Sequence, residues 1–170
     1  MATTSPAPEL IPYGAHAVDE DDIAAVCAVL RSKFLTTGPL VGEFEEAFKT
    51  YTGAVGAVAV CNGTAALHAA VFALDICKKE QEVIVPPLTF CSTANVVLHQ
   101  GASVRFADLD PETLCICPES VAKAIVPGKT VAVIAVDYGG QPCDYDALRQ
   151  VCDPHGVKII ADASHSYGAT

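Results

Sequence analysis

Positive charge is scarce in this sequence. The 170 residues include 10 Lys and Arg against 20 Asp and Glu, so the formal net charge at pH 7 is -10. Nucleic acids and anionic membranes attract proteins chiefly through positive charge, and the charge balance argues against both as partners. The dense acidic run Asp19–Asp22 is expected to open a helix at the positive end of the helix dipole rather than to bind a metal.

Long apolar stretches are absent as well. No run reaches the roughly 20 residues that cross a bilayer, and the sequence does not open with a basic segment followed by an apolar one. Hydrophobic residues make up 51% and charged residues 18%, which is typical of a globular chain with a sizeable core. We expect residues 1–10 to form a flexible tail, residues 11–170 to form one domain, and the protein to be cytoplasmic.

Paired cysteines at the spacing of a zinc site are also missing. Cys115 and Cys117 are close together, but no second pair accompanies them. The remaining cysteines occur singly in apolar segments. This pattern predicts small buried hydrophobic residues in a reducing compartment, with no metal site and no disulfide framework.

Apolar residues recur with two different periods along the chain. Up to Gly53, spacings of three and four residues predict two helices, the first capped by Asp19 and the second ending near Gly53. Beyond Gly53, short apolar runs alternate with helical patterns. The predicted strands are 57–61, 82–86, 104–107, 131–136 and 157–161, and the predicted helices are 63–74, 92–99, 119–125 and 144–152.

This alternation indicates βαβ crossovers and a mainly parallel sheet. The apolar runs contain no regular polar residues, so both faces of the sheet should be covered by helices. The predicted fold class is therefore α/β, with three layers and helices flanking the sheet.

One candidate site follows the last predicted strand. Asp162 and His165 lie just past its carboxyl end, which is the edge where open α/β sheets bind ligands. An acidic side chain at this edge can hydrogen-bond a cofactor ring nitrogen and hold it protonated. It can equally cap the next turn, and the strand alone does not decide between the two.

Two further candidates follow earlier strands. In Asn62-Gly-Thr-Ala-Ala66, free backbone N–H groups and the helix dipole can bind an anion, with the Thr64 hydroxyl as an added donor; an empty helix capped by Thr64 is equally open. The glycine-rich dinucleotide motif and the Walker lysine are both missing, which disfavours a Rossmann-like nucleotide binder. Phe90 can lie flat against a planar heteroaromatic cofactor, or it can belong to the core.

These motifs occur together in one known family. With Leu35–Pro39, Asp108–Thr113, Asp137–Pro142 and Asp162–Gly168, the chain resembles the DegT/StrS-type sugar aminotransferases, which depend on pyridoxal 5'-phosphate (PLP). They belong to the fold-type I aspartate aminotransferase superfamily. The resemblance implies amination of a nucleotide-linked keto sugar by a homodimer, with glutamate as the expected amino donor.

The resemblance also assigns residues. It implies that Gly63, Thr64 and Ala65 contact the PLP phosphate, that Phe90 stacks on the ring, and that Asp162 pairs with the pyridine nitrogen. His165 would approach the ring's O3′, and Thr37 and Gly38 would contact substrate. Many relatives carry Gln where His165 stands, and the His form looks most like the 4-aminotransferases that act on UDP-linked 4-keto-6-deoxy-N-acetylhexosamines.

One departure from the family concerns the Schiff-base lysine. In the family this lysine lies beyond the element that carries Asp162, and therefore beyond Thr170. None of the chain's own lysines is suitably placed, since Lys158 begins the strand that Asp162 ends. We therefore expect the chain to be the N-terminal portion of the PLP-binding large domain, without its C-terminal part and small domain, and to be inactive alone. The alternative is an inactive remnant that binds or regulates a full-length homologue.

Overall fold

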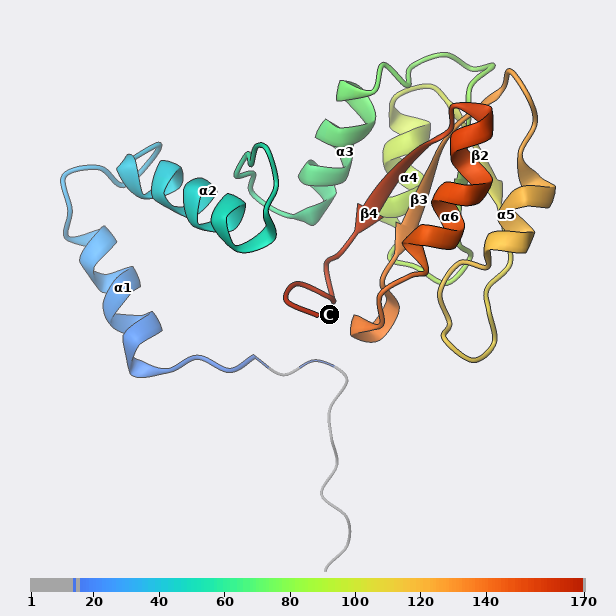
Figure 1. The fold of residues 1–170 in the computed structure, drawn as a ribbon. Helices are drawn as coiled ribbons and strands as arrows, with labels where there is room; N and C mark the ends of the chain where they lie inside the picture. The colour runs from blue at the N-terminus through green and yellow to red at the C-terminus, as the bar shows by residue number, and fades with distance from the viewer. Residues whose placement is uncertain (1–13, 15, 170) are drawn as a thin grey trace, which may run out of the picture. The chain divides into compact units, whose positions relative to one another are not determined.

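The structure of the protein is a computed structural model that describes residue 14 and residues 16–169. The tail expected over residues 1–10 lies outside the described residues. The chain forms two compact units, Met1–Ala59 and Val60–Thr170, whose elements are labelled in Figure 1. The expected domain boundaries stay a prediction.

The first unit contains the helices α1 (Glu20–Leu30) and α2 (Pro39–Thr52). Asp19 caps α1, because its carboxylate accepts from the Asp22 N–H at 3.0 Å while the Asp22 carboxylate accepts from the Asp19 N–H at 3.1 Å. This reciprocal cap satisfies two backbone donors that the first turn would leave unpaired. α2 ends at Gly53, whose φ of 71° is a left-handed conformation that glycine adopts without strain. The acidic run therefore begins a helix, as predicted.

The second unit is built on a parallel four-stranded sheet with the strand order β2-β1-β3-β4. The strands are β1 (Glu82–Val85), β2 (Ser103–Phe106), β3 (Thr130–Val136) and β4 (Lys158–Asp162). The helices are α3 (Gly63–Ala73), α4 (Ser92–His99), α5 (Pro118–Ala124) and α6 (Tyr145–Cys152), with short 3-10 turns η1 (Tyr138–Gly140) and η2 (Asp153–His155). The ends of these strands and α-helices lie within one residue of the predicted ones, which confirms the expected α/β class.

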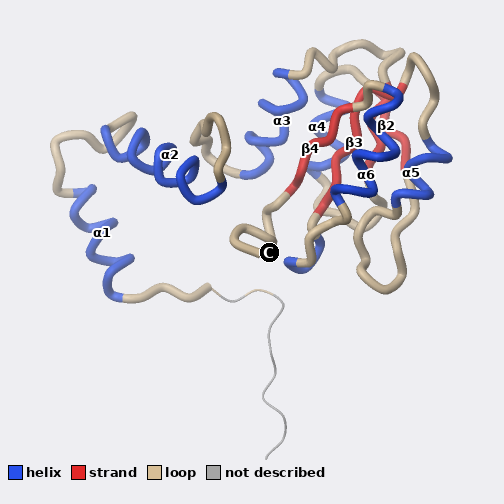
Figure 2. Tube along the Cα trace, in the orientation of Figure 1, coloured by secondary structure: helices blue, strands red, loops and turns tan. Residues whose placement is uncertain are grey.

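Helices cover both faces of this sheet (Figure 2). Successive side chains of a strand point to opposite faces. Accordingly, alternate residues of β1 and β3 pack into two separate clusters. One cluster contains side chains of α3 and α4, and the other contains side chains of α5 and α6. The predicted three-layer arrangement is therefore confirmed.

The strand predicted at 57–61 is wrong. Residues 57–61 form no strand and pair with no strand of the described chain. Val58 and Val60 are 82% and 43% exposed, so these apolar side chains are not buried within the described chain. A strand needs a neighbour to satisfy its backbone groups, and the local apolar run cannot show whether that neighbour exists.

The cysteines follow the prediction only in part. Cys115, Cys143 and Cys152 are buried, whereas Cys61, Cys77 and Cys91 are exposed, which corrects the expectation for those positions. All of the cysteines are free thiols. The exposed ones lie at the ends of helices and in turns, where an apolar sequence neighbourhood does not ensure coverage.

The strand order places a switch point between β1 and β3. From β1 the chain continues outward to β2, and it then returns to the other side of β1 to form β3 and β4. Open α/β sheets bind ligands beside the carboxyl ends of the strands at such a point. None of the described helices is both long and apolar enough to span a membrane.

Candidate functional site

Asp162 occupies the carboxyl end of β4 and faces the layer formed by α3 and α4. Ile160, two residues earlier on the same face, packs into the α3–α4 cluster. Asp162 is only 7% exposed. Its carboxylate is therefore held inside the protein at the edge of the sheet where the sequence predicted a ligand.

Uncharged donors surround this carboxylate. Thr93 Oγ1, in the first turn of α4, donates to Oδ2 at 3.2 Å. Ser164 donates to Oδ1 through its hydroxyl at 2.6 Å and through its backbone N–H at 3.3 Å. No lysine or arginine of the described chain forms an ion pair with Asp162. The bond from the Ser164 N–H shows that Asp162 caps its turn, and its predicted pairing with a cofactor ring stays a prediction.

A buried carboxylate without a cation is costly, because removal from water penalises the charged form. The hydroxyl donors offset part of this cost. A cationic N–H group arriving at the open side of the site would offset much more. The donor set of Asp162 therefore fits a protonated ring nitrogen.

The N-terminus of α3 lies beside the segment that follows Asp162. A Cβ placed on Gly63 would stand 3.4 Å from Ser164 Oγ, which shows how closely the two segments approach. Asn62 caps the helix by accepting from the Ala65 N–H at 2.9 Å; Thr64 is not the cap. The Gly63 and Thr64 N–H groups have no acceptor among the described residues. This helix end therefore retains free donors for an anion.

Phe90 lies between the end of β1 and the start of α4. Its side chain is 71% exposed, so it does not belong to the core. Its backbone carbonyl accepts from the Thr93 N–H at 3.1 Å. The ring is therefore held at the surface of the turn that leads directly to Thr93, which donates a hydrogen bond to Asp162.

His165 turns toward the 3-10 turn η1. Its Nδ1 accepts from the Gly139 N–H at 3.3 Å, and its ring meets the Tyr138 ring edge-on, with centroids 6.2 Å apart. With Nδ1 as the acceptor, the ring proton lies on Nε2. Gly140 fits this turn because its φ is 91° and a Cβ there would approach the His165 carbonyl oxygen to 3.2 Å.

A second buried carboxylate, Asp137, was not predicted to have a role. It follows β3, is 4% exposed, and accepts from the Cys143 N–H at 2.9 Å, the Tyr145 hydroxyl at 2.7 Å and the Ser166 hydroxyl at 2.6 Å. Burial, together with the nearby carboxylate, raises the pKa of the Tyr145 phenol and of the Cys143 thiol. Thr93 and Ser164 were also missed, and their only sequence signal is the run of hydroxyl residues beside the predicted site.

Thr37 and Gly38 lie in the first unit, between α1 and α2. They line a small pocket of about 170 Å³ together with side chains of the same connection. Thr37 adopts a φ of 50°, which is unusual for a residue with a branched side chain. The structure thus places them in a turn that lines a small pocket, and their predicted contact with substrate stays a prediction.

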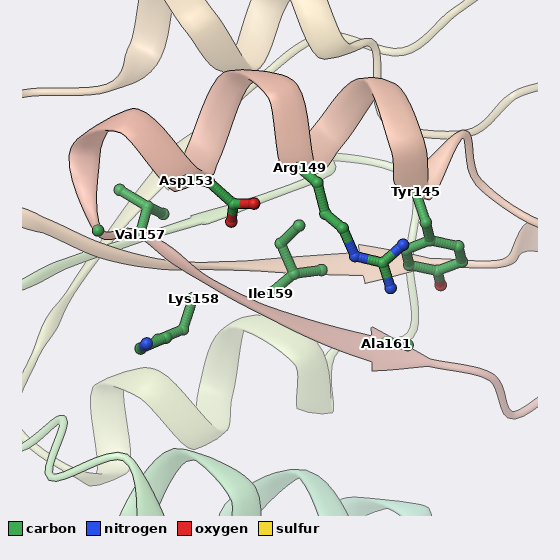
Figure 3. Close-up of a pocket in the computed structure, with 8 residues that line it drawn as sticks. Tyr145, Arg149, Asp153, Val157, Lys158, Ile159 and Ala161 are labelled. Carbon is green, nitrogen blue, oxygen red and sulfur yellow. The ribbon is translucent and has the colours of Figure 1, made fainter. Parts of the chain in front are cut away.

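The larger pocket, of about 480 Å³, lies elsewhere in the second unit (Figure 3). It lies along β4 and α6, and the side chains of Tyr145 and Arg149 extend into it from the helix. Lys158 begins β4 at one end of this pocket, whereas Asp162 ends the strand. The pocket faces the α6 side of the sheet and is separate from the site around Asp162.

The fold of this chain is similar to the folds of solved aminotransferases and of a related dehydratase. The aminotransferase from Psychrobacter cryohalolentis is 36% identical, with a TM-score of 0.85 over 91% of this chain and 39% of its own. Spr1654 from Streptococcus pneumoniae, described as a candidate sugar aminotransferase and solved in its PMP form, is 30% identical, with a TM-score of 0.86 over 94% of this chain and 43% of its own. A GDP-4-keto-6-deoxymannose-3-dehydratase with a trapped PLP-glutamate geminal diamine is 30% identical, with a TM-score of 0.86 over 94% of this chain and 42% of its own.

The chain thus spans less than half the length of each of these relatives. Residues 16–170 match the model of a single family. The chain belongs to the DegT/DnrJ/EryC1/StrS aminotransferase family.

Proposed function

We propose that this chain is the N-terminal portion of a PLP-dependent enzyme that transfers an amino group from glutamate to a nucleotide-linked keto sugar. The observation that carries the proposal is the environment of Asp162. It is a buried carboxylate at a strand end, it has uncharged donors only from Thr93 and Ser164, and it lies near a helix N-terminus with free N–H groups. A phosphorylated, protonated pyridine ring suits all of these features.

The residues around Asp162 fit PLP in complementary ways. Asp162 would pair with the pyridine nitrogen, and the α3 N-terminus would bind the phosphate through Gly63, Thr64 and Ala65. The Ala65 N–H already donates to Asn62, so the N–H groups of Gly63 and Thr64 would bear most of that contact. The exposed ring of Phe90 would lie against the cofactor. When bound, PLP supplies an electron sink for the carbon that gains or loses the amino group.

Asp162 would act by keeping the proton on the ring nitrogen, because an adjacent carboxylate favours the cationic form. Its burial strengthens the effect, since an ion pair away from water is weakly screened. His165 would direct its Nε2–H toward the ring oxygen O3′. These roles position and polarise the ring, and they do not require a base from this chain.

The substrate class is supported by the relatives. Spr1654 is described as a candidate sugar aminotransferase, and the dehydratase is named for a GDP-linked keto sugar and was solved with a trapped PLP-glutamate geminal diamine. Within the family we propose a UDP-linked 4-keto-6-deoxy-N-acetylhexosamine as substrate, because His165 stands where many relatives carry Gln. The free thiols favour a reducing compartment, which supports a cytoplasmic enzyme, and we propose that it functions as a homodimer.

The Schiff-base lysine is proposed to lie outside this chain. Lys158, the lysine of β4, stands at the strand end opposite Asp162. The chain alone should therefore show no transamination. Incubating Met1–Thr170 with PLP, reducing with borohydride and mapping pyridoxyl-lysine by mass spectrometry tests this point. Stoichiometric labelling of one lysine with measurable turnover would overturn it.

The substrate assignment is tested on the complete enzyme. We expect amination of a UDP-linked 4-keto sugar with glutamate, and little exchange between ordinary amino acids and oxo acids. Brisk amino-acid exchange without sugar turnover would contradict the substrate class. If the complete gene product carries no lysine beyond Thr170, the alternative of an inactive regulatory remnant holds in its place.

A further inference from the structure

Thr93 connects two parts of the proposed cofactor site that are distant in sequence. Its hydroxyl donates to Asp162 Oδ2 at 3.2 Å, while its backbone N–H donates to the carbonyl of Phe90 at 3.1 Å. The residue is fully buried, so water does not compete for either bond. One side chain thus fixes the carboxylate relative to the turn that carries the aromatic ring.

A second hydroxyl extends the connection. Thr89 Oγ1 lies 2.7 Å from Thr93 Oγ1. An ionised carboxylate only accepts hydrogen bonds, and a threonine hydroxyl has a single proton. The Thr93 proton is therefore committed to Asp162, and Thr89 must donate to Thr93. The result is a series of hydrogen bonds in which Thr89 donates to Thr93 and Thr93 donates to Asp162.

Hydrogen bonds in such a series strengthen one another, because every donation polarises the next hydroxyl. The hydrogen bonds therefore hold one oxygen of the Asp162 carboxylate in place.

We propose that Thr93 is a positioning residue for the PLP reaction, supported by Thr89, and that it keeps the Asp162 carboxylate oriented toward the ring nitrogen. The inference rests on the proposed function. Ser164 holds the other carboxylate oxygen at 2.6 Å, so the two hydroxyls together determine the carboxylate plane. Thr93 touches neither substrate nor cofactor in this role and acts only through Asp162.

The test compares Thr93→Val with Thr93→Ser in the complete, PLP-loaded enzyme. Valine keeps the size of the side chain and removes the hydroxyl, whereas serine keeps the hydroxyl. A carboxylate that is no longer held in line with the ring nitrogen stabilises the proton there less well. We expect the absorbance change that marks loss of this proton to move to lower pH in Thr93→Val. PLP binding should weaken by up to about tenfold, because the charge-assisted pair between Asp162 and the ring nitrogen loses its alignment.

Thr130→Val is the matched control. Thr130 is also a buried threonine, and its hydroxyl accepts from the Val126 N–H at 2.8 Å, but it begins β3 at the opposite edge of the sheet. Its variant should lose stability without a spectral change. Thr89→Val should shift the spectrum in the same direction by less, and it decides the question if Thr93→Val does not fold.

The outcomes separate the two proposals. Equal spectra and PLP affinities for Thr93→Val and Thr130→Val, in an enzyme that binds PLP, would overturn the positioning role alone. A spectral shift that persists in Thr93→Ser would also overturn it, because the hydroxyl would then be irrelevant. Failure of the unsubstituted complete enzyme to bind PLP would overturn the proposed function and this inference together.

Discussion

Asp137 and Asp162 end neighbouring strands, yet their surroundings differ. They are 4% and 7% exposed, and the Asp137 N–H donates to the Asp162 carbonyl at 3.1 Å. Asp137 faces α6, where Cys143, Tyr145 and Ser166 surround it with donors. Asp162 faces the other layer, beside the helix starts of α3 and α4. Burial alone therefore does not identify a functional carboxylate.

The difference lies in what each carboxylate connects. Asp137 ties the connection before α6 to the segment after β4, through donors from Cys143, Tyr145 and Ser166. Asp162 is held by two hydroxyls at a helix-lined edge where a ligand can approach. We interpret Asp137 as a structural clamp and Asp162 as the partner of the cofactor.

The sharpest test of this comparison is Asp162→Asn in the complete enzyme. The amide loses the charge that keeps the ring nitrogen protonated, and we expect the rate to fall at least about a hundredfold, equivalent to roughly 2.7 kcal/mol of transition-state stabilisation. Asp146→Asn, on the exposed surface of α6, is the control, since it breaks only a solvent-exposed pair with Arg149. Unchanged kcat in the Asp162 variant would show that another group pairs with the ring.

Asp137→Ala tests the other half of the comparison. It leaves the Tyr145 hydroxyl, the Ser166 hydroxyl and the Cys143 N–H without their acceptor, and we expect a loss of about 2 kcal/mol in the free energy of unfolding. Urea denaturation of the chain measures this loss. Asp162→Asn should cost clearly less stability by the same measurement, and the reverse order would contradict the assignment of roles.

Tyr145→Phe tests the clamp through pH. Burial, with the bond to Asp137, raises the pKa of Tyr145 in the folded protein. The unfolded phenol ionises near pH 10, so the folded state keeps its proton while the unfolded state loses it. The stabilising contribution is therefore complete below about pH 10 and is lost as pH rises above that value. Urea midpoints between neutral and alkaline pH should fall more steeply for the wild type than for Tyr145→Phe; parallel curves would exclude the effect.

The layers of the fold could be predicted because each strand and each helix shows its own hydrophobic periodicity in the local sequence. The apolar runs at 82–86 and 131–136 and the helical pattern at 92–99 are complete signals in themselves. The run at 57–61 has the same local signal but no pairing strand in the described chain, and pairing is not a local property. The sequence therefore predicts elements better than it predicts their neighbours.

The positions of the candidate site residues in the fold were predictable to the same extent. Asp162, Phe90 and Gly63 follow strand ends or begin helices, and that position marks them. The supporting bonds were not predictable, because Thr93 and Asp162 are 69 residues apart and Asp137 and Ser166 are 29 apart. Ordinary hydroxyl residues acquire a role only when the topology of the sheet brings them together.

The parallel strand order also bears on how the protein folds. Among the described residues, β4 follows the other three strands in sequence and pairs with β3, and the contact between Thr93 and Asp162 spans 69 residues. Contacts of such long sequence separation slow folding, because the loops between them must close first. During synthesis the first strands of this unit can collapse before β4 leaves the ribosome. The proposed cofactor site should accordingly form later than the contacts between β1 and β2, and PLP would then favour the finished state by binding to it alone.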